Sequence, residues 1–337
     1  MTAIRKTAGL RFNRKGKYVL GLDLGGTKIA VGLVNLKGKV INSLREPTPL
    51  GSGPEGVCER MAEMSKEILL RTGVGRREIA GIGIGAGGPL DLKKGMLLSP
   101  PNLPGFHGYP LKDKIEEYTG MHAALENDAN AAALGEMMFG AGRKAKNLIY
   151  MTVSTGIGGG IIVDGKLVHG VGWSAGEVGH MTLKPDGPEC NCGNRGCLEA
   201  LSSGTAIAKR AKEEVGENPS SLILKVAEGG KNTIDAEVVF RAADLGDTVA
   251  CRIIDEALFY LGIGIGNLIT AFSPETVILG GGLTGAGDRL FVRVREIVKE
   301  RVKLVPVNKI PIVPAGLGES AGIVGAASLL LQKPVGV

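Results

Sequence analysis

Four side chains that commonly bind zinc stand close together between residues 180 and 197. The set comprises His180, Cys190, Cys192 and Cys197. Three thiolates and one imidazole complete a tetrahedral shell that leaves no position open for water. The pattern therefore predicts a structural Zn²⁺ rather than a hydrolytic one. A group of unmetallated thiols is the alternative.

Two carboxylates flank this zinc loop, which we define as residues 180–197. Glu177 precedes His180, and Glu199 follows Cys197. A bound metal would hold both carboxylates near the imidazole and would orient its second ring nitrogen toward a ligand. Carboxylates and an imidazole that converge in this way suit a ligand with several neighbouring hydroxyl groups. We therefore expect the loop to form part of a sugar site.

A second polar cluster stands between an apolar strand pattern over 123–126 and an alanine-rich helix pattern that ends near residue 140. It contains Glu126, Asn127, Asp128 and Asn130. Capping of the helix would explain one of these residues but does not require all four. The helix dipole should keep the Asp128 carboxylate ionised at neutral pH. Such a carboxylate suits phosphoryl transfer, in which the acceptor hydroxyl must be oriented and lose its proton.

Three glycine-rich turns, at residues 25–28, 156–160 and 280–282, each follow an apolar strand pattern. Consecutive glycines expose backbone N–H groups that can bind phosphate, although tight β-turns alone are the alternative. The sequence has no GxxxxGK[ST] loop and no convincing dinucleotide fingerprint, so a nucleotide held between two lobes is favoured. The residues expected at the nucleotide are Asp23, Gly25, Gly26, Thr27, Lys28, Thr155, Gly156, Gly158, Gly280, Gly281 and Gly282.

Asp23 interrupts the first apolar strand directly before its glycine turn. A carboxylate inside a buried strand is costly unless it meets a cation or hydrogen-bond donors. Beside a phosphate-binding turn, it suits an outer or water-mediated ligand of Mg²⁺. A salt bridge to Lys28 or another base is the alternative.

The pattern of strand, glycine turn and strand occurs twice, about 130 residues apart, which predicts an internal duplication. The first copy begins with the strand over 18–24, and the second begins with the strand over 148–154. We expect two similar lobes that face each other across a cleft and each contribute one glycine turn. A helical region is expected over 204–272, and a helix packed through small residues over 316–332.

Length and composition indicate a globular protein of two lobes. The 337 residues are 44% hydrophobic and 22% charged, and no apolar run of about 18 residues predicts a membrane span. The net charge of +6 resides in residues 1–17, which leaves 34 bases against 34 acids elsewhere. A basic arm on a neutral body does not predict a nucleic-acid-binding face. The odd count of five cysteines and the absence of a signal peptide favour a reducing, cytoplasmic location.

Together these motifs resemble the ROK family of repressors and sugar kinases, in its bacterial glucokinase branch, from about residue 18 to residue 332. The resemblance rests on LDLGGTK, IGIGAGGPLD at 82–91, ENDANAA at 126–132, TGIGGG, GEVGH, CNCGNRGCLE and LGGG. It implies an α/β, ribonuclease-H-like (actin-like ATPase) fold of two lobes with a central cleft. The implied division is a basic arm 1–17, a small lobe 18–131 plus 320–337, and a large lobe 132–319.

The resemblance also implies roles for individual residues. Asp128 would be the catalytic base toward the 6-hydroxyl of a hexose. The sugar would contact Gly88, Asn127, Asp128, Glu177, His180 and Glu199. The cofactors would be ATP with Mg²⁺, and a structural Zn²⁺ on His180, Cys190, Cys192 and Cys197. The partners would be the hexose and ATP, with no nucleic acid or membrane, and the chain would form a dimer or tetramer.

The identity of the sugar stays open at this stage. The stretch SPPNLPGFHGYPL at 99–111 resembles glucokinases and favours glucose, whereas kinases of N-acetylmannosamine, mannose, fructose or allose share the framework. Repressors of the family carry an N-terminal helix-turn-helix domain, and residues 1–17 show no helical period. A non-catalytic sugar sensor would be expected to lack Asp128 or the glycine turns, both of which are present.

Overall fold

A computed structural model describes residues 12–331 except residues 14, 217 and 219. These residues form two compact units. Unit 1 comprises the described chain up to Lys144, together with Gly160–Ala175 and the segment from Gly316 onward. Unit 2 comprises Ala145–Gly159 and Gly176–Ala315. Most of the basic arm expected over 1–17 lies outside the described residues.

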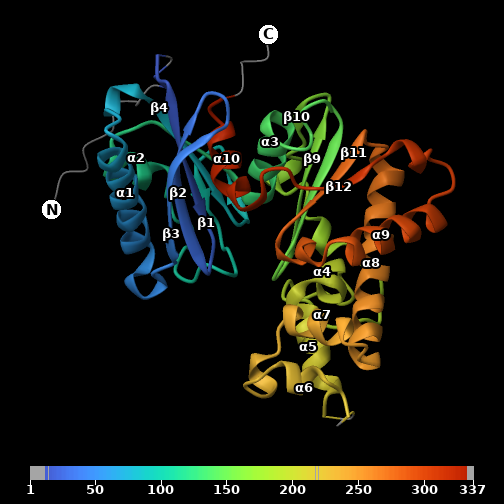
Figure 1. The fold of residues 1–337 in the computed structure, drawn as a ribbon. Helices are drawn as coiled ribbons and strands as arrows, with labels where there is room; N and C mark the ends of the chain where they lie inside the picture. Colours follow the sequence, from blue (N-terminus) through green and yellow to red (C-terminus); the bar gives the residue numbers. More distant parts are fainter. Residues whose placement is uncertain (1–11, 14, 217, 219, 332–337) are drawn as a thin grey trace. The chain divides into compact units, whose positions relative to one another are not determined.

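The sheet of unit 1 has the strand order β3-β2-β1-β4-β7 (Figure 1). The strands are β1 (Tyr18–Leu24), β2 (Lys28–Asn35), β3 (Val40–Pro47), β4 (Ile79–Ala86) and β7 (Ala123–Asn127). The first three strands pair antiparallel, whereas β1, β4 and β7 run parallel. A small hairpin of β5 (Leu90–Asp91) and β6 (Met96–Leu97) lies within the proline-rich connection.

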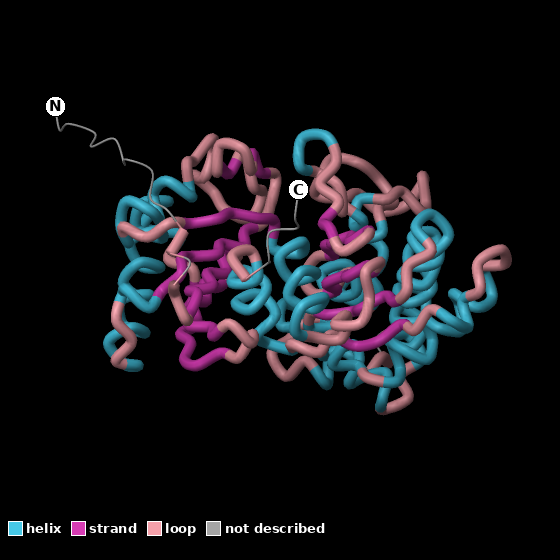
Figure 2. Tube along the Cα trace, turned by 90° about the horizontal axis from the view of Figure 1, so that it is seen from above, coloured by secondary structure: helices cyan, strands magenta, loops and turns pink. Residues whose placement is uncertain are grey.

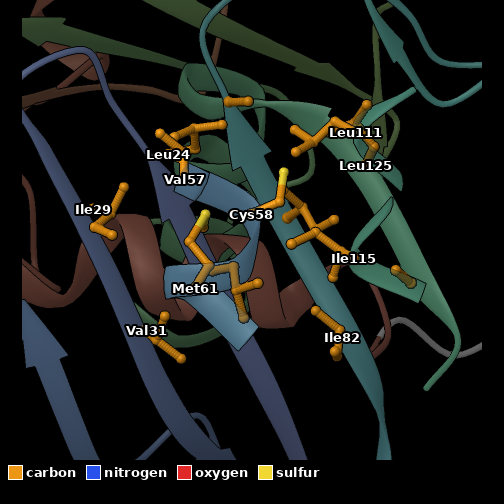
Figure 3. Packing of buried hydrophobic residues seen from close by; sticks show 14 of the residues in the cluster. Leu24, Ile29, Val31, Val57, Cys58, Met61, Ile82, Leu111, Ile115 and Leu125 are labelled. Atoms are coloured by element: carbon orange, nitrogen blue, oxygen red, sulfur yellow. The ribbon is translucent and has the colours of Figure 1, made fainter. Parts of the chain in front are cut away.

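Helices cover both faces of this sheet (Figures 1 and 2). Successive side chains of β1 point to opposite faces, so they pack against different helices. Leu20, Leu22 and Leu24 belong to the large core formed with α1 (Gly53–Thr72) and α2 (Leu111–Thr119). Figure 3 shows Val57 and Met61 of α1 in this cluster. Val19 belongs instead to the cluster that contains Ile323 and Ala327 of α10 (Ala321–Ser328).

Small residues let α10 and α3 (Asp128–Phe139) approach closely, as the sequence predicts. A Cβ atom on Gly325 of α10 would lie 2.6 Å from the backbone of Ala131 in α3. A Cβ atom on Gly21 of β1 would lie 2.0 Å from the carbonyl oxygen of Ile323. Larger side chains at these positions would therefore separate α10 from its neighbours. The start of α3 is held at the carboxyl end of β7, which it follows directly.

The second sheet repeats the pattern of the first, with the order β10-β9-β8-β11-β12. The strands are β8 (Leu148–Val153), β9 (Ile157–Val163), β10 (Lys166–Leu167), β11 (Thr276–Gly280) and β12 (Ile312–Pro314). Strands β8, β11 and β12 run parallel, as β1, β4 and β7 do in unit 1. The equivalent order confirms the internal duplication.

The helices of unit 2 are α4 (Leu198–Ser202), α5 (Gly204–Glu214), α6 (Ile223–Val226), α7 (Ala236–Asp244), α8 (Thr248–Phe272) and α9 (Asp288–Arg301). The helical region expected over 204–272 consists of the four helices α5 to α8, and α9 is a further helix outside that region. Among the described residues, α8 alone is long and apolar enough to cross a membrane. The sequence analysis did not predict this apolar helix. Most of its apolar window is buried in the protein, and such a helix is typical of a globular core.

Two expected boundaries differ from the structure. The division expected after residue 131 falls inside α3, a continuous helix that belongs entirely to unit 1. The glycine turn expected over 156–160 is in fact almost wholly a strand, because β9 begins at Ile157 and includes Gly158. Close packing accounts for two of the strand glycines: a Cβ atom on Gly159 would lie 2.6 Å from Val178, and one on Gly160 2.8 Å from the carbonyl oxygen of Ala129.

Candidate active site

Neighbouring parallel strands bring the candidate catalytic residues of unit 1 to one edge of the sheet. Asp23 of β1 lies opposite Gly85 of β4, and Gly85 lies opposite Glu126 of β7. Gly88 therefore follows the end of β4 at the edge where Asn127 ends β7. The carboxyl edge of a parallel sheet is where open α/β folds bind their ligands. Three motifs that are distant in the sequence thus meet there.

The turn from β7 into α3 positions Asn127 and Asp128. The Asn127 side chain caps the helix, since its Oδ1 accepts from the backbone N–H groups of Ala129 at 3.0 Å and Asn130 at 3.2 Å. Asp128 is the first helical residue, and its side-chain Oδ1 accepts from the N–H of Ala129 at 2.8 Å. The capping residue is therefore Asn127, which leaves Asp128 exposed at the edge.

Two opposing effects act on the Asp128 carboxylate. Desolvation by the surrounding protein raises the pKa of Asp128, whereas the hydrogen bond from Ala129 lowers it. Desolvation is the larger effect, so the shift runs opposite to the one expected from the helix dipole alone. Because the residue keeps contact with solvent, screening limits the rise. A carboxylate of this kind is a better proton acceptor than an ordinary aspartate.

Asp23 lies on the face of β1 that α10 covers. A Cβ atom on Gly322 in α10 would lie 2.2 Å from its Oδ2 atom, so only glycine leaves room for this carboxylate. Burial and, as a second cause, the negative charge of Asp128 raise the pKa of Asp23 to about 6. Lys28 and Arg45 lower the pKa, but they do not offset the burial. Both acids at this edge thus lack full charge compensation from the described protein residues.

We expect Asp23→Asn to stabilise the ligand-free protein. Because the folded-state pKa of Asp23 lies above its ordinary value of 3.8, its contribution to the free energy of unfolding falls as pH rises from about 4 to about 6. That difference corresponds to roughly 3 kcal/mol. Urea unfolding between pH 4 and 7 should show a smaller pH-dependent loss in the variant. Asp113→Asn, at an exposed position, is the control, and an identical slope in wild type and Asp23→Asn would contradict the assignment.

The first glycine turn is closed by its own backbone. The Gly25 N–H donates to the carbonyl of Lys28 at 3.0 Å, so this amide does not face a phosphate as expected. A Cβ atom on Gly26 would lie 2.3 Å from the carbonyl oxygen of Asn102, which belongs to the segment 99–111. Gly26 is therefore required for close packing, and the carbonyl of Thr27 accepts from the N–H of Thr48, directly after β3.

In unit 2, the carboxyl ends of β8 and β11 lie side by side and open on a cavity of about 1320 Å³. Thr155 and Gly282 line it, which brings together the second and third glycine turns. Gly281 has a φ of 87°, and a Cβ atom there would lie 2.5 Å from the carbonyl oxygen of Val153. Gly280 ends β11, where a Cβ atom would meet the hydroxyl of Tyr150. These two glycines thus shape the edge of the sheet.

Most of the cavity wall comes from helices that carry no recognisable motif. Lys209 and Lys212 come from α5, Phe240 and Arg241 from α7, and Leu283 and Arg289 from the segment around α9. The residues of α5, α7 and α9 were not predicted, because each stands in an ordinary amphipathic helix pattern, whereas Leu283 directly follows the third glycine turn. Five basic side chains line the cavity together with the four acids Glu213, Asp235, Glu237 and Asp244, so the wall carries a small excess of positive charge. The cavity suits a ligand with an anionic part and an apolar part.

The four predicted metal ligands converge in unit 2. Their donor atoms all lie within 4.8 Å of one another. The Cys190 Sγ lies 3.6 Å from the His180 Nδ1, and the Cys192 Sγ lies 3.7 Å from the Cys197 Sγ. Tetrahedral zinc, with bonds of about 2.3 Å to sulfur and about 2.0 Å to nitrogen, requires separations of roughly 3.5–3.8 Å. These two separations match that geometry, and the whole set, which lies within 4.8 Å, fits Zn²⁺ after small side-chain shifts.

The zinc loop also positions the two expected sugar-binding carboxylates. The His180 Nε2, on the ring edge opposite Nδ1, lies 3.9 Å from the Glu177 Oε2. Glu199 lies on α4, which begins directly after Cys197. Its Oε2 accepts from the backbone N–H of Ile157 at 2.8 Å, and a Cβ atom on Gly156 would lie 2.6 Å from that oxygen. The hydrogen bond of Glu199 therefore links the end of the zinc loop to the second glycine turn.

The duplicated sheets, the carboxyl-edge residues and the cavity define an actin-like ATPase fold of the kind found in sugar kinases. The model of the ROK family matches residues 19–333, and the chain belongs to this family. A glucokinase of Thermotoga maritima is 40% identical over 94% of this chain and 98% of its own length. A xylose repressor of Bacillus spizizenii is 30% identical over 97% of this chain and 80% of its own length.

A solved structure of a relative with bound ligands is also similar to this chain. The ROK family glucokinase of Streptomyces griseus, in complex with glucose and AMPPNP, matches with a TM-score of 0.81 and 34% identity. The match covers 93% of this chain and 98% of that one. The expected family and fold class are thereby confirmed.

Proposed function

We propose that the protein transfers the γ-phosphoryl group of ATP to the 6-hydroxyl of a hexose, with glucose as the preferred acceptor. The observation that carries the proposal is the carboxyl edge of unit 1, where Asp23, near the end of β1, and Asp128, directly after β7, lie on opposite sides of the strand β4. Similarity to glucokinases over nearly the whole chain supports the same activity. The similarity to a xylose repressor is lower, at 30% identity.

Asp128 would act as the base. Its carboxylate accepts the proton of the 6-hydroxyl while the hydroxyl oxygen attacks the γ-phosphorus in line and the bond to the β-phosphate oxygen breaks. ADP leaves, and the proton stays on Asp128 until solvent removes it. The side-chain amide of Asn127 would donate to the sugar, since its oxygen already caps α3. Gly88 would contribute backbone groups beside them.

The nucleotide would occupy the cavity of unit 2. Thr155 and Gly282 would bind phosphate, Phe240 and Leu283 would contact the base, and the cavity lysines and arginines would offset the phosphate charge. Gly25, Gly26, Thr27, Lys28, Gly156, Gly158, Gly280 and Gly281 would shape the phosphate environment. Asp23 would hold Mg²⁺ through water, because its uncompensated carboxylate fits a cation. The ion would supply charge neutralisation at the phosphates.

His180, Cys190, Cys192 and Cys197 would hold a structural Zn²⁺, which keeps the loop folded. Glu177 and Glu199 would then bind sugar hydroxyls together with the Nε2 edge of His180. A cytoplasmic location and assembly into a dimer or tetramer stay predictions.

A panel of sugars in an ADP-release assay tests the proposed activity. The purified protein with ATP and Mg²⁺ is supplied with glucose, mannose, fructose, allose or N-acetylmannosamine. We expect glucose to give the highest kcat/KM and a sugar-free control to release little ADP. A preference for N-acetylmannosamine would reject glucose as the acceptor, and no stimulation by any sugar would reject the kinase assignment.

A further inference from the structure

One buried acid beside the candidate base has a partner that none of the sequence motifs includes. Glu126 of β7 is 5% exposed and immediately precedes Asn127 and Asp128. Its Oε2 accepts from the His169 Nε2 at 2.7 Å. Its Oε1 accepts from the N–H of Asn127 at 2.9 Å and from the side-chain amide of Asn130 at 3.1 Å. Glu126 therefore holds the peptide group that leads into the Asp128 turn.

His169 is the cation that this carboxylate requires. The Asn127 and Asn130 donors are neutral, and a buried carboxylate with only neutral donors is costly. The pKa of His169 is raised by its hydrogen bond to Glu126, which agrees with a charged pair. The imidazolium thus compensates the charge and also fixes the side-chain rotamer of Glu126.

His169 begins a closed loop, His169–Ala175, which we call the strap. The Ala175 N–H donates to the carbonyl of His169 at 3.0 Å and closes it. The His169 ring packs edge-on against Trp173, with 5.4 Å between ring centroids. Trp173 has a φ of 63°, a conformation that a bulky side chain rarely adopts without support. From the strap the chain continues into Gly176 and Glu177.

We propose that His169 is a positioning residue: through Glu126 it fixes the Asn127–Asp128 turn, and through the strap it fixes the segment that leads to Glu177. This inference rests on the proposed function. One ion pair would thereby hold two segments that are 43 residues apart in sequence. Nucleotide binding does not depend on these contacts.

The decisive comparison is between His169→Gln and the double variant Glu126→Gln/His169→Gln. The single variant leaves a buried carboxylate without its cation, and we expect kcat/KM for glucose to fall by roughly 10²-fold, as for a displaced catalytic group. KM for ATP should stay within about twofold, because the affected residues do not touch the cavity of unit 2. The double variant buries an uncharged amide pair, which keeps a hydrogen bond. It should recover to within about tenfold of wild type.

His122→Gln is the matched control. His122 Nδ1 lies 3.2 Å from the buried Glu116, but at the amino end of β7. This variant should keep kcat/KM for glucose within about twofold of wild type. A His169 that serves only packing would leave the single and double variants equally impaired, and that result would overturn the proposal. Wild-type kcat/KM in His169→Gln would overturn it as well.

The one tryptophan of the sequence supplies a readout that is independent of turnover. Because Trp173 touches His169, its fluorescence reports the strap. Glucose should change the emission of the wild type, and the glucose Kd measured in this way should rise in His169→Gln and recover in the double variant. If the wild type binds glucose but phosphorylates no sugar, the proposed function fails while the strap is still tested. If His169→Gln does not fold, the double variant must still fold and retain activity, and its failure would reject the proposal.

Discussion

Replacement of Asp128 by asparagine should reduce kcat by roughly 10²–10⁴-fold, the usual effect of removing a positioned base. The variant should fold, because the asparagine oxygen can still accept from the N–H of Ala129 as the carboxylate does. It should also bind glucose, since Asn127 and the zinc loop are unchanged. The loss should therefore appear in kcat and leave the glucose Kd within a few fold.

The matched control is Asp288→Asn. Asp288 is also the first residue of a helix, α9, and is exposed, but it does not line the cavity. Its replacement should leave kcat unchanged. Because the charge of Asp128 raises the pKa of Asp23, the pKa of Asp23 should fall in Asp128→Asn. An Asp128→Asn enzyme with wild-type turnover would show that another group takes the proton.

Replacement of Cys192 by serine should remove the zinc and weaken sugar binding. Cys192 is the exposed member of the set, so the substitution leaves the buried thiols of Cys190 and Cys197 in place. Glu199 lies two residues beyond Cys197, and Glu177 lies beside His180, so a loosened loop displaces both carboxylates. We expect KM for glucose to rise by about 10–100-fold, the range seen when support of a metal site is lost.

Zinc content, measured by elemental analysis, should fall from one ion per chain to almost none. Cys251→Ser is the control, because Cys251 lies outside the cluster and donates to the carbonyl of Ala243. Zinc content and KM should not change in that variant. A metal-free Cys192→Ser protein with unchanged glucose affinity would separate the metal from the sugar site.

The elements that carry continuous apolar patterns could be predicted closely from the sequence. The first strand was expected over 18–24 and is β1, Tyr18–Leu24, and the repeated strand order confirms the duplication. Such strands are buried on both faces, so their limits are marked by glycines and charges. The zinc loop could be predicted for a different reason. Its four ligands are close in sequence, and short spacing restricts the arrangements that the loop can adopt.

Other features depend on contacts that local patterns do not contain. The glycines at the start of β9 indicate a turn, but they lie in a strand because neighbouring backbone approaches them closely. The cavity residues of α5 and α7 come together only in the folded unit. The direction of the Asp128 pKa shift was likewise not predicted, because the helix dipole can be read from the sequence whereas desolvation cannot.

The position of the transferred phosphate is the most direct test of the proposed reaction. Wild-type protein is incubated with ATP, Mg²⁺ and glucose, and the product is assigned by two-dimensional phosphorus–proton NMR. We predict a single sugar product in which the phosphorus couples to the protons on carbon 6. A phosphate on any other carbon, or ADP formed without a phosphorylated sugar, would contradict the assignment of Asp128 as the base for the 6-hydroxyl.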